Sequence, residues 1–263
     1  NAALALNILS PGMAQANTGT GSFVIAYSDK PVFDRKCRVL CSAAAIPGKW
    51  IVEAGIFNTG AIYRWFRNQF YSGEEANYTY MNEEEEASPL GANGVMMIAH
   101  FEGSAAPFWN PYAKGLFFNL SLGTKRGDMV RAIFEGIAME IADNFSLIET
   151  VSGEINTISV AGGMTKADLF NQIQSDVFYK KVVRYQSSEA SSMGAAMGAT
   201  VTLGIYNTYE EAFAHIVGKE DKIYEPNAEN HIKYDKLRLR KHALYNALNQ
   251  RRVYEKFVKN INN

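Results

Sequence analysis

Cysteine is almost absent from this sequence, which contains only Cys37 and Cys41. The two lie four positions apart in a stretch of strand-like composition, which would separate them by roughly 13 Å, too far for a disulfide. Such a low cysteine content is typical of a protein in a reducing compartment. We therefore expect a cytoplasmic protein in which both thiols are small core residues.

Two further absences exclude whole classes of partner. No apolar run approaches the ~20 residues that a membrane-spanning helix needs. Charged residues make up 20% of the chain and the net charge is -1, so no basic surface for nucleic acid or for a membrane is implied. We expect neither partner, and 263 residues are enough to bury a full core.

The sequence also lacks an initial methionine and a signal-peptide pattern. It starts at Asn1 and runs directly into apolar residues 2–6, and residues 1–9 are typical of the later part of a helix. Pro11 and Gly12 end that segment. We interpret the sequence as a piece of a longer protein, cut inside a helix.

What the sequence does contain is glycine at the ends of predicted strands. An apolar run over residues 157–161 ends at Gly162 and Gly163. Thr165 can cap the helix that follows, with Asp168 three places on to favour the positive helix end. Such a turn lets the backbone approach something flat or anionic, and a nucleotide is the obvious candidate. An ordinary tight turn is the alternative.

A glycine-rich hairpin lies near the start of the chain. Residues 13–27 can form two paired strands around the turn Thr18-Gly19-Thr20-Gly21. Free backbone N–H groups and threonine hydroxyls line such a turn, which can cradle a phosphate. Many hairpin turns have this composition without binding anything.

Gly60 opens a helix predicted to run through residue 71, and it could approach a ligand or pack closely on the preceding strand. The acidic run over residues 83–86 lies in the most polar stretch, and we interpret it as a solvated helix face. The remaining pattern predicts a second hairpin (38–54), strands (95–99, 115–122, 181–185) and helices (128–148, 189–203, 209–217, 230–259). This order indicates an α/β fold whose mixed sheet is covered by helices, with a helical C-terminal extension.

Five stretches, in this order, resemble the FGGY family of carbohydrate kinases, glycerol kinases in particular. The glycine-rich hairpin resembles the family's phosphate loop, and Gly162-Gly163 resembles its adenosine motif. The five stretches are residues 12–23, 109–115, 122–136, 161–176 and 189–196. The resemblance covers about residues 1–212.

This resemblance implies the actin-like, ribonuclease-H-like ATPase fold and the C-terminal domain of a two-domain kinase. We assign residues 1–217 to this nucleotide-binding domain and residues 218–263 to a C-terminal helical extension. Such kinases use ATP and Mg²⁺ to phosphorylate a hydroxyl of a sugar or polyol, such as xylulose or glycerol. By resemblance, Phe23 would pack against that acceptor, and the nucleotide would be held by Thr18, Gly19, Thr20, Gly21, Gly60, Gly162 and Gly163.

The family's general base is an aspartate that would lie shortly before Asn1. The family's N-terminal domain carries most sugar contacts and the carboxylates linked to magnesium. We therefore expect no catalytic residue and no metal ligand in this fragment, which should be inactive by itself. Its expected partner is the missing N-terminal domain, and a homodimer is the other assembly that we consider.

Three positions depart from the family pattern. Glu102-Gly103-Ser104 follows a predicted strand where many members have Gly-Glu-Arg, Ala167 stands near an asparagine of glycerol kinases, and Arg64 is more similar to pentulose kinases. Two other classes stay open: a non-catalytic actin-like ATP-binding module and a Rossmann-type dinucleotide enzyme. The second is disfavoured because no G-x-G-x-x-G follows a first strand.

Overall fold

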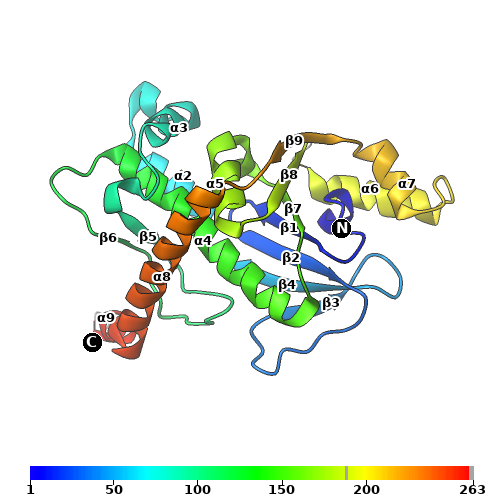
Figure 1. Cartoon of the computed structure of the whole chain (residues 1–263), viewed down its shortest axis with the longest axis horizontal. Coiled ribbons are helices and arrows are strands. Elements are labelled where there is room, and N and C mark those ends of the chain that lie inside the picture. Colours follow the sequence, from blue (N-terminus) through cyan, green and yellow to red (C-terminus); the bar gives the residue numbers. More distant parts are fainter. Residues whose placement is uncertain (187–188, 261–263) are drawn as a thin grey trace.

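The computed structural model describes residues 1–186 and 189–260, and a seven-stranded sheet organises this part of the chain (Figure 1). The strand order is β3-β4-β2-β1-β7-β8-β9, and a separate small sheet pairs β5 with β6. The strands are β1 Met13–Thr18, β2 Ser22–Ser28, β3 Leu40–Ala43, β4 Trp50–Ile56, β5 Met96–Ile98, β6 Leu116–Phe118, β7 Thr157–Ala161, β8 Lys181–Tyr185 and β9 Glu220–Tyr224.

The main sheet is mixed, as the sequence predicts. β1, β7 and β8 run parallel, whereas the other neighbouring strands pair antiparallel. Asn17 pairs with Phe23 of β2 on one side and with Ala161 of β7 on the other, so the turns after β1 and β7 lie at the same edge. Both predicted hairpins are confirmed. The edge that holds the turns after β1 and β7 is where ligands bind in open sheets that contain parallel strands.

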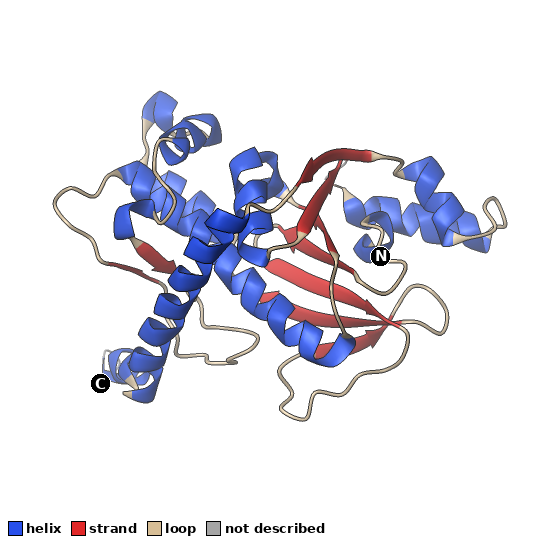
Figure 2. Ribbon diagram, viewed as in Figure 1, coloured by secondary structure: helices blue, strands red, loops and turns tan. Residues whose placement is uncertain are grey.

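Helices cover both faces of the sheet (Figure 2). α4 (Arg126–Ser152) crosses one face against β2 and β4, and α5 (Asp168–Phe178) packs beside it. Ala14 and Val24 are fully buried on that face, whereas Tyr27 and Val183 belong to a second cluster with α1 and α6. The other helices are α1 Ala2–Ala5, α2 Gly60–Phe70, α3 Tyr78–Glu86, α6 Ala190–Thr202, α7 Tyr209–Ile216, α8 Ala228–Gln250 and α9 Val253–Asn260, with 3₁₀ turns η1 Gly73–Glu75, η2 Ala92–Gly94 and η3 Gly163–Lys166.

The two ends of the chain differ from the predicted helices. The first helix is only one turn long and ends at Ala5, well before Pro11. The predicted C-terminal helix is two helices, because Arg252 adopts a left-handed conformation (φ 54°) between α8 and α9. β9 lies between α7 and α8 and was not predicted, because four of its five residues are exposed and show no alternation.

The predictions that both cysteines lie in the core and that the whole acidic run is a solvated face are wrong. Cys37 is exposed and lies in a turn with φ 51°, and Cys41 is partly exposed on the edge strand β3, so neither is a core residue. Within the acidic run, Glu85 is fully buried because it faces Arg131 of α4. Only part of that helix surface is therefore solvated.

Candidate functional site

The turn between β1 and β2 is tied to the first turn of α2. Gly60 N donates a hydrogen bond to Gly19 O (3.0 Å), and Ala61 N donates to Thr20 O (3.1 Å). A Cβ on Gly60 would collide with the carbonyl group of Gly19, so this approach requires glycine. The N-terminus of an 11-residue helix, with its positive dipole end, thus lies beside the turn.

Three hydroxyl groups support this turn from inside the protein. Ser22 Oγ lies 3.2 Å from Thr18 Oγ1 and 3.0 Å from Thr59 Oγ1, and all three residues are buried. The Thr18 side chain therefore fixes the shape of the turn from behind. Thr20, at the tip, is exposed.

A second glycine turn follows β7. Gly162 has φ +96°, and a Cβ there would collide with the backbone of Thr18, so this residue joins the two turns closely. A Cβ on Gly163 would meet no heavy atom within 4 Å. The predicted role of Thr165 as a helix cap is wrong: it belongs to η3 and donates to Gly162 O (2.8 Å), while α5 begins only at Asp168.

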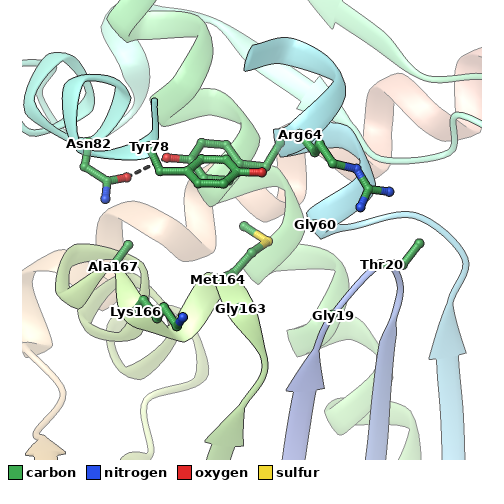
Figure 3. A pocket seen from close by; sticks show the side chains of 11 residues that line it. Gly19, Thr20, Gly60, Arg64, Tyr78, Asn82, Gly163, Met164, Lys166 and Ala167 are labelled. Carbon is green, nitrogen blue, oxygen red and sulfur yellow. Dashed lines mark hydrogen bonds between the residues drawn. The ribbon is translucent and has the colours of Figure 1, made fainter. Parts of the chain in front are cut away.

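The two turns and the start of α2 border a cavity of about 290 Å³, here called the main cavity (Figure 3). Four of the residues predicted to bind a nucleotide line it, namely Gly19, Thr20, Gly60 and Gly163. Thr18 and Gly162 pack behind it, as described above. The other lining residues are Tyr63, Arg64, Tyr78, Asn82, Met164, Lys166 and Ala167.

The wall of the main cavity farthest from Thr20 is aromatic and polar (Figure 3). Tyr63 of α2 and Tyr78 of α3 stack with ring centroids 5.0 Å apart, and Tyr63 Oη donates to Asn82 Oδ1 at 2.6 Å. No motif identifies these three residues in the sequence. The 78–82 spacing, which places two side chains on one face of a helix, was the only available signal.

Phe23 and Gly21 line a neighbouring cavity of about 280 Å³, here called the second cavity. The Phe23 side chain is 58% exposed, so it is not a core residue of β2. Phe57 and Trp109 bring two more exposed rings to this cavity. Its other lining residues are Ser22, Leu40, Glu53, Ala54, Gly55, Ile56 and Ala105, which give it one carboxylate and no cationic side chain.

The main cavity has cationic groups at its mouth. Arg64 and Lys166 line it from α2 and η3, and both residues are exposed. Over residues 1–186 and 189–260, no group of three or more His, Cys, Asp or Glu side chains could hold a metal ion. Nor does any helix in this described part have the length and hydropathy to cross a membrane.

A buried carboxyl group lies behind the aromatic wall. Glu85 is 3.3 Å from Arg131 Nη1, but Arg131 Nε also pairs with Glu135 at 2.9 Å, so one guanidinium serves two carboxyl groups. Burial raises the pKa of Glu85 to about 8, and the attraction of Arg131 only partly offsets this effect. Glu85 therefore keeps its proton near neutral pH.

This protonation predicts how stability depends on pH. Because the pKa of Glu85 is higher in the folded state, that state binds a proton that the unfolded chain has lost between about pH 4.5 and 8. The free energy of unfolding should therefore fall as pH rises through this window, by at most about 1.4 kcal/mol per pH unit. Glu85→Gln should remove this fall, whereas Glu86→Gln, at an exposed neighbour, should not. Urea unfolding at pH 5, 6.5 and 8 measures both, and equal slopes in all variants would contradict the assignment.

Known proteins resemble this chain in sequence. Residues 14–203 match the model for the FGGY family of carbohydrate kinases, C-terminal domain. A glycerol kinase of Saccharolobus islandicus is 32% identical over 225 residues, which cover 82% of this chain and 43% of that protein. A gluconokinase of Bacillus licheniformis is 29% identical over 247 residues, which cover 89% of this chain and 47% of the relative.

Solved structures share the fold. A xylulose kinase of Lactobacillus acidophilus superposes with a TM-score of 0.87 at 23% identity, over 97% of this chain and 51% of that one. A glycerol kinase of Plasmodium falciparum, solved with ADP, gives 0.79 at 23% identity, over 95% and 49%. The predicted actin-like ATPase fold is confirmed, and the chain spans about half the length of these relatives. The chain belongs to the FGGY family of carbohydrate kinases, and residues 14–203 correspond to the family's C-terminal domain.

Proposed function

We propose that this chain is the nucleotide-binding half of a kinase that transfers the γ-phosphoryl group of ATP to a hydroxyl of a sugar or polyol. The observation that carries the proposal is the main cavity, where Gly19, Gly60 and Gly163 bring three backbone segments together around an open space. Side chains at such positions would occupy the space or separate the segments. The N–H groups of Gly19 and Gly60 already donate to Gly21 O and Gly19 O, so phosphate oxygens would be bound by other N–H donors around this space.

The phosphate groups would lie at the Thr20 end. There the N-terminus of α2 favours an anion and Arg64 adds positive charge, while Lys166 lines the cavity on the side of Ala167 (Figure 3). Positioning and electrostatic stabilisation account for most of the catalysis in phosphoryl transfer, which suits a site of this kind. We propose that Mg²⁺ enters with the phosphates, since it is commonly bound through phosphates, waters and one or two carboxylates.

The acceptor would lie in the second cavity, which adjoins the same turn through Gly21. The exposed rings of Phe23, Phe57 and Trp109 can pack against the carbon skeleton of a sugar or polyol. Glu53 is the charged residue among those that line it. We therefore propose a neutral acceptor such as xylulose or glycerol, because a carboxylate of gluconate would meet Glu53 without a cation from this wall.

The remaining contacts would come from a second domain. The relatives are about twice as long as this chain, which supports an N-terminal partner domain that supplies the catalytic base and further acceptor contacts. A cytoplasmic location, a homodimer and the division at residue 217 likewise stay predictions. A division at residue 217 would separate β9 from β8, although these two strands pair in the main sheet.

Gly163→Val is the test of the nucleotide site. The new Cβ would have no heavy atom within 4 Å and the side chain would stand in the main cavity, so the fold should persist while ADP affinity falls at least tenfold. Gly198→Val is the matched control, because Gly198 on α6 also has open space around its Cβ position and lies outside the cavity. Calorimetric titration of both variants with ADP gives the comparison. Unchanged affinity in Gly163→Val would argue that the turn is only structural.

A further inference from the structure

The end of the main cavity away from Thr20 has the form of a slot. The stacked rings of Tyr63 and Tyr78 make one wall, and Gly163 and Met164 lie across from them (Figure 3). An apolar slot of this kind accepts the face of a flat aromatic group. Asn82 stands at the far end of the slot, where the edge of such a group would come to lie.

The amide of Asn82 is held in one orientation. Tyr63 Oη donates to Asn82 Oδ1, and burial raises the pKa of Tyr63, so the phenol remains a donor at neutral pH. Among residues 1–186 and 189–260, no group accepts a hydrogen bond from Asn82 Nδ2. The amide therefore offers two N–H donors and one oxygen lone pair to a molecule in the slot.

The helix that carries Asn82 is firmly anchored on α4. Glu84 Oε1 lies 2.7 Å from Arg126 Nη2. One residue later, the buried Glu85 faces Arg131. A polar group on a fixed helix can discriminate between ligands, because a shift of the helix to suit another ligand would cost these contacts.

We propose that Asn82 reads the base of the bound nucleotide, pairing with the amino group of adenine and with a neighbouring ring nitrogen. The inference rests on the proposed function, which brings a nucleotide to this cavity, and adds the residue that selects its base. Adenine presents N6–H as a donor beside N1 or N7 as an acceptor, and an asparagine amide matches the N6/N7 pair or its N1 counterpart. The amino group takes part in both pairings, so it is contacted whichever edge faces Asn82.

Aspartate at this position would present acceptors alone. It would lose the donor to the adenine ring nitrogen, but it would match the N1–H and N2–H donors of guanine. Asn82→Asp should therefore weaken ADP and move the ratio of ADP to GDP affinity toward GDP by at least tenfold. Asn82→Ala should weaken ADP by about ten- to hundredfold and leave the affinity for tripolyphosphate, which has no base, unchanged.

Calorimetric titration of the 263-residue chain and these variants with ADP, GDP and tripolyphosphate tests the proposal. Asn246→Asp serves as the control, because Asn246 is exposed on α8 and does not line the main cavity. It should keep the affinities of the unmodified chain. Equal ADP affinity in the unmodified chain, Asn82→Ala and Asn82→Asp would overturn the proposal.

A second measurement needs no substitution and so does not depend on how the variants fold. The diphosphate of purine riboside lacks the amino group, and we expect the unmodified chain to bind it about tenfold more weakly than ADP. Equal affinity would overturn the role of Asn82 while leaving the nucleotide site intact. If the unmodified chain bound none of ADP, GDP and tripolyphosphate, the proposed function itself would fail, and this inference with it.

Discussion

Lys241→Met is expected to lower the free energy of unfolding by about 3–5 kcal/mol, because it leaves two buried carboxylates without their shared cation. Lys241 is 2% exposed, and its Nζ lies 2.6 Å from Glu140 Oε2 and 2.7 Å from Asp143 Oδ2. Burial by itself would raise the pKa of both carboxyl groups, but the charge of Lys241 holds both below their usual range. Methionine fills the space of the lysine stem without supplying that charge.

Urea unfolding at pH 7, followed by circular dichroism, measures this effect. Lys236→Met is the matched control: it removes a lysine from the exposed face of the same helix and should change stability by no more than about 0.5 kcal/mol. A loss below about 1 kcal/mol for Lys241→Met would contradict the prediction. It would mean that His100, 2.9 Å from Glu140, and Arg238, 2.9 Å from Asp143, are sufficient partners for these carboxylates.

The parts of the site that are local in sequence could be predicted, because glycine and threonine mark them directly. The turn over residues 18–21 connects two strands of one hairpin, and Gly162 follows the strand that pairs with its first strand. Each of these glycine and threonine patterns lies within the turn that it predicts, or within a few residues of it. The mixed sheet followed from the same local patterns, whereas the exposed edge strand β9 has no pattern of its own and depends on pairing with β8.

The far wall of the main cavity could not be predicted, because distant contacts create it. Tyr78 and Asn82 belong to the most polar stretch, and the acidic run beside them resembles a solvated face. In the structure Glu85 is buried against Arg131, which lies 46 positions later in the chain. This buried pair helps to hold α3 against α4 beside the cavity. The sequence around a glutamate does not show that an arginine far away in the chain will pair with it in the core.

Phosphoryl transfer by this 263-residue chain alone is expected to be undetectable, even if the chain binds ADP as proposed. By resemblance to the family, we expect the general base to lie outside this chain, and such a base contributes typically 10²–10⁴-fold in rate. The chain spans 43–51% of its relatives, so a partner domain would be needed to orient the acceptor as well. Orientation can account for ~7–11 kcal/mol of a barrier. Loss of the general base or of acceptor orientation would each slow the transfer strongly. Together they should bring turnover below the background hydrolysis of ATP.

A coupled assay of ADP release tests this prediction with glycerol, xylulose, ribulose and gluconate. The assay compares the present chain with a chain extended upstream to its natural start, and Gly163→Val in each supplies the background rate. Turnover by the short chain that depends on an acceptor would show that its own residues contain the base, and Glu53 of the second cavity would be the first carboxylate to replace. Turnover by the extended chain with xylulose or glycerol but not with gluconate would support a neutral acceptor. If the extended chain bound ADP and phosphorylated none of the four, the non-catalytic actin-like ATP-binding module would become the better account, because a nucleotide site without transfer is what that alternative requires.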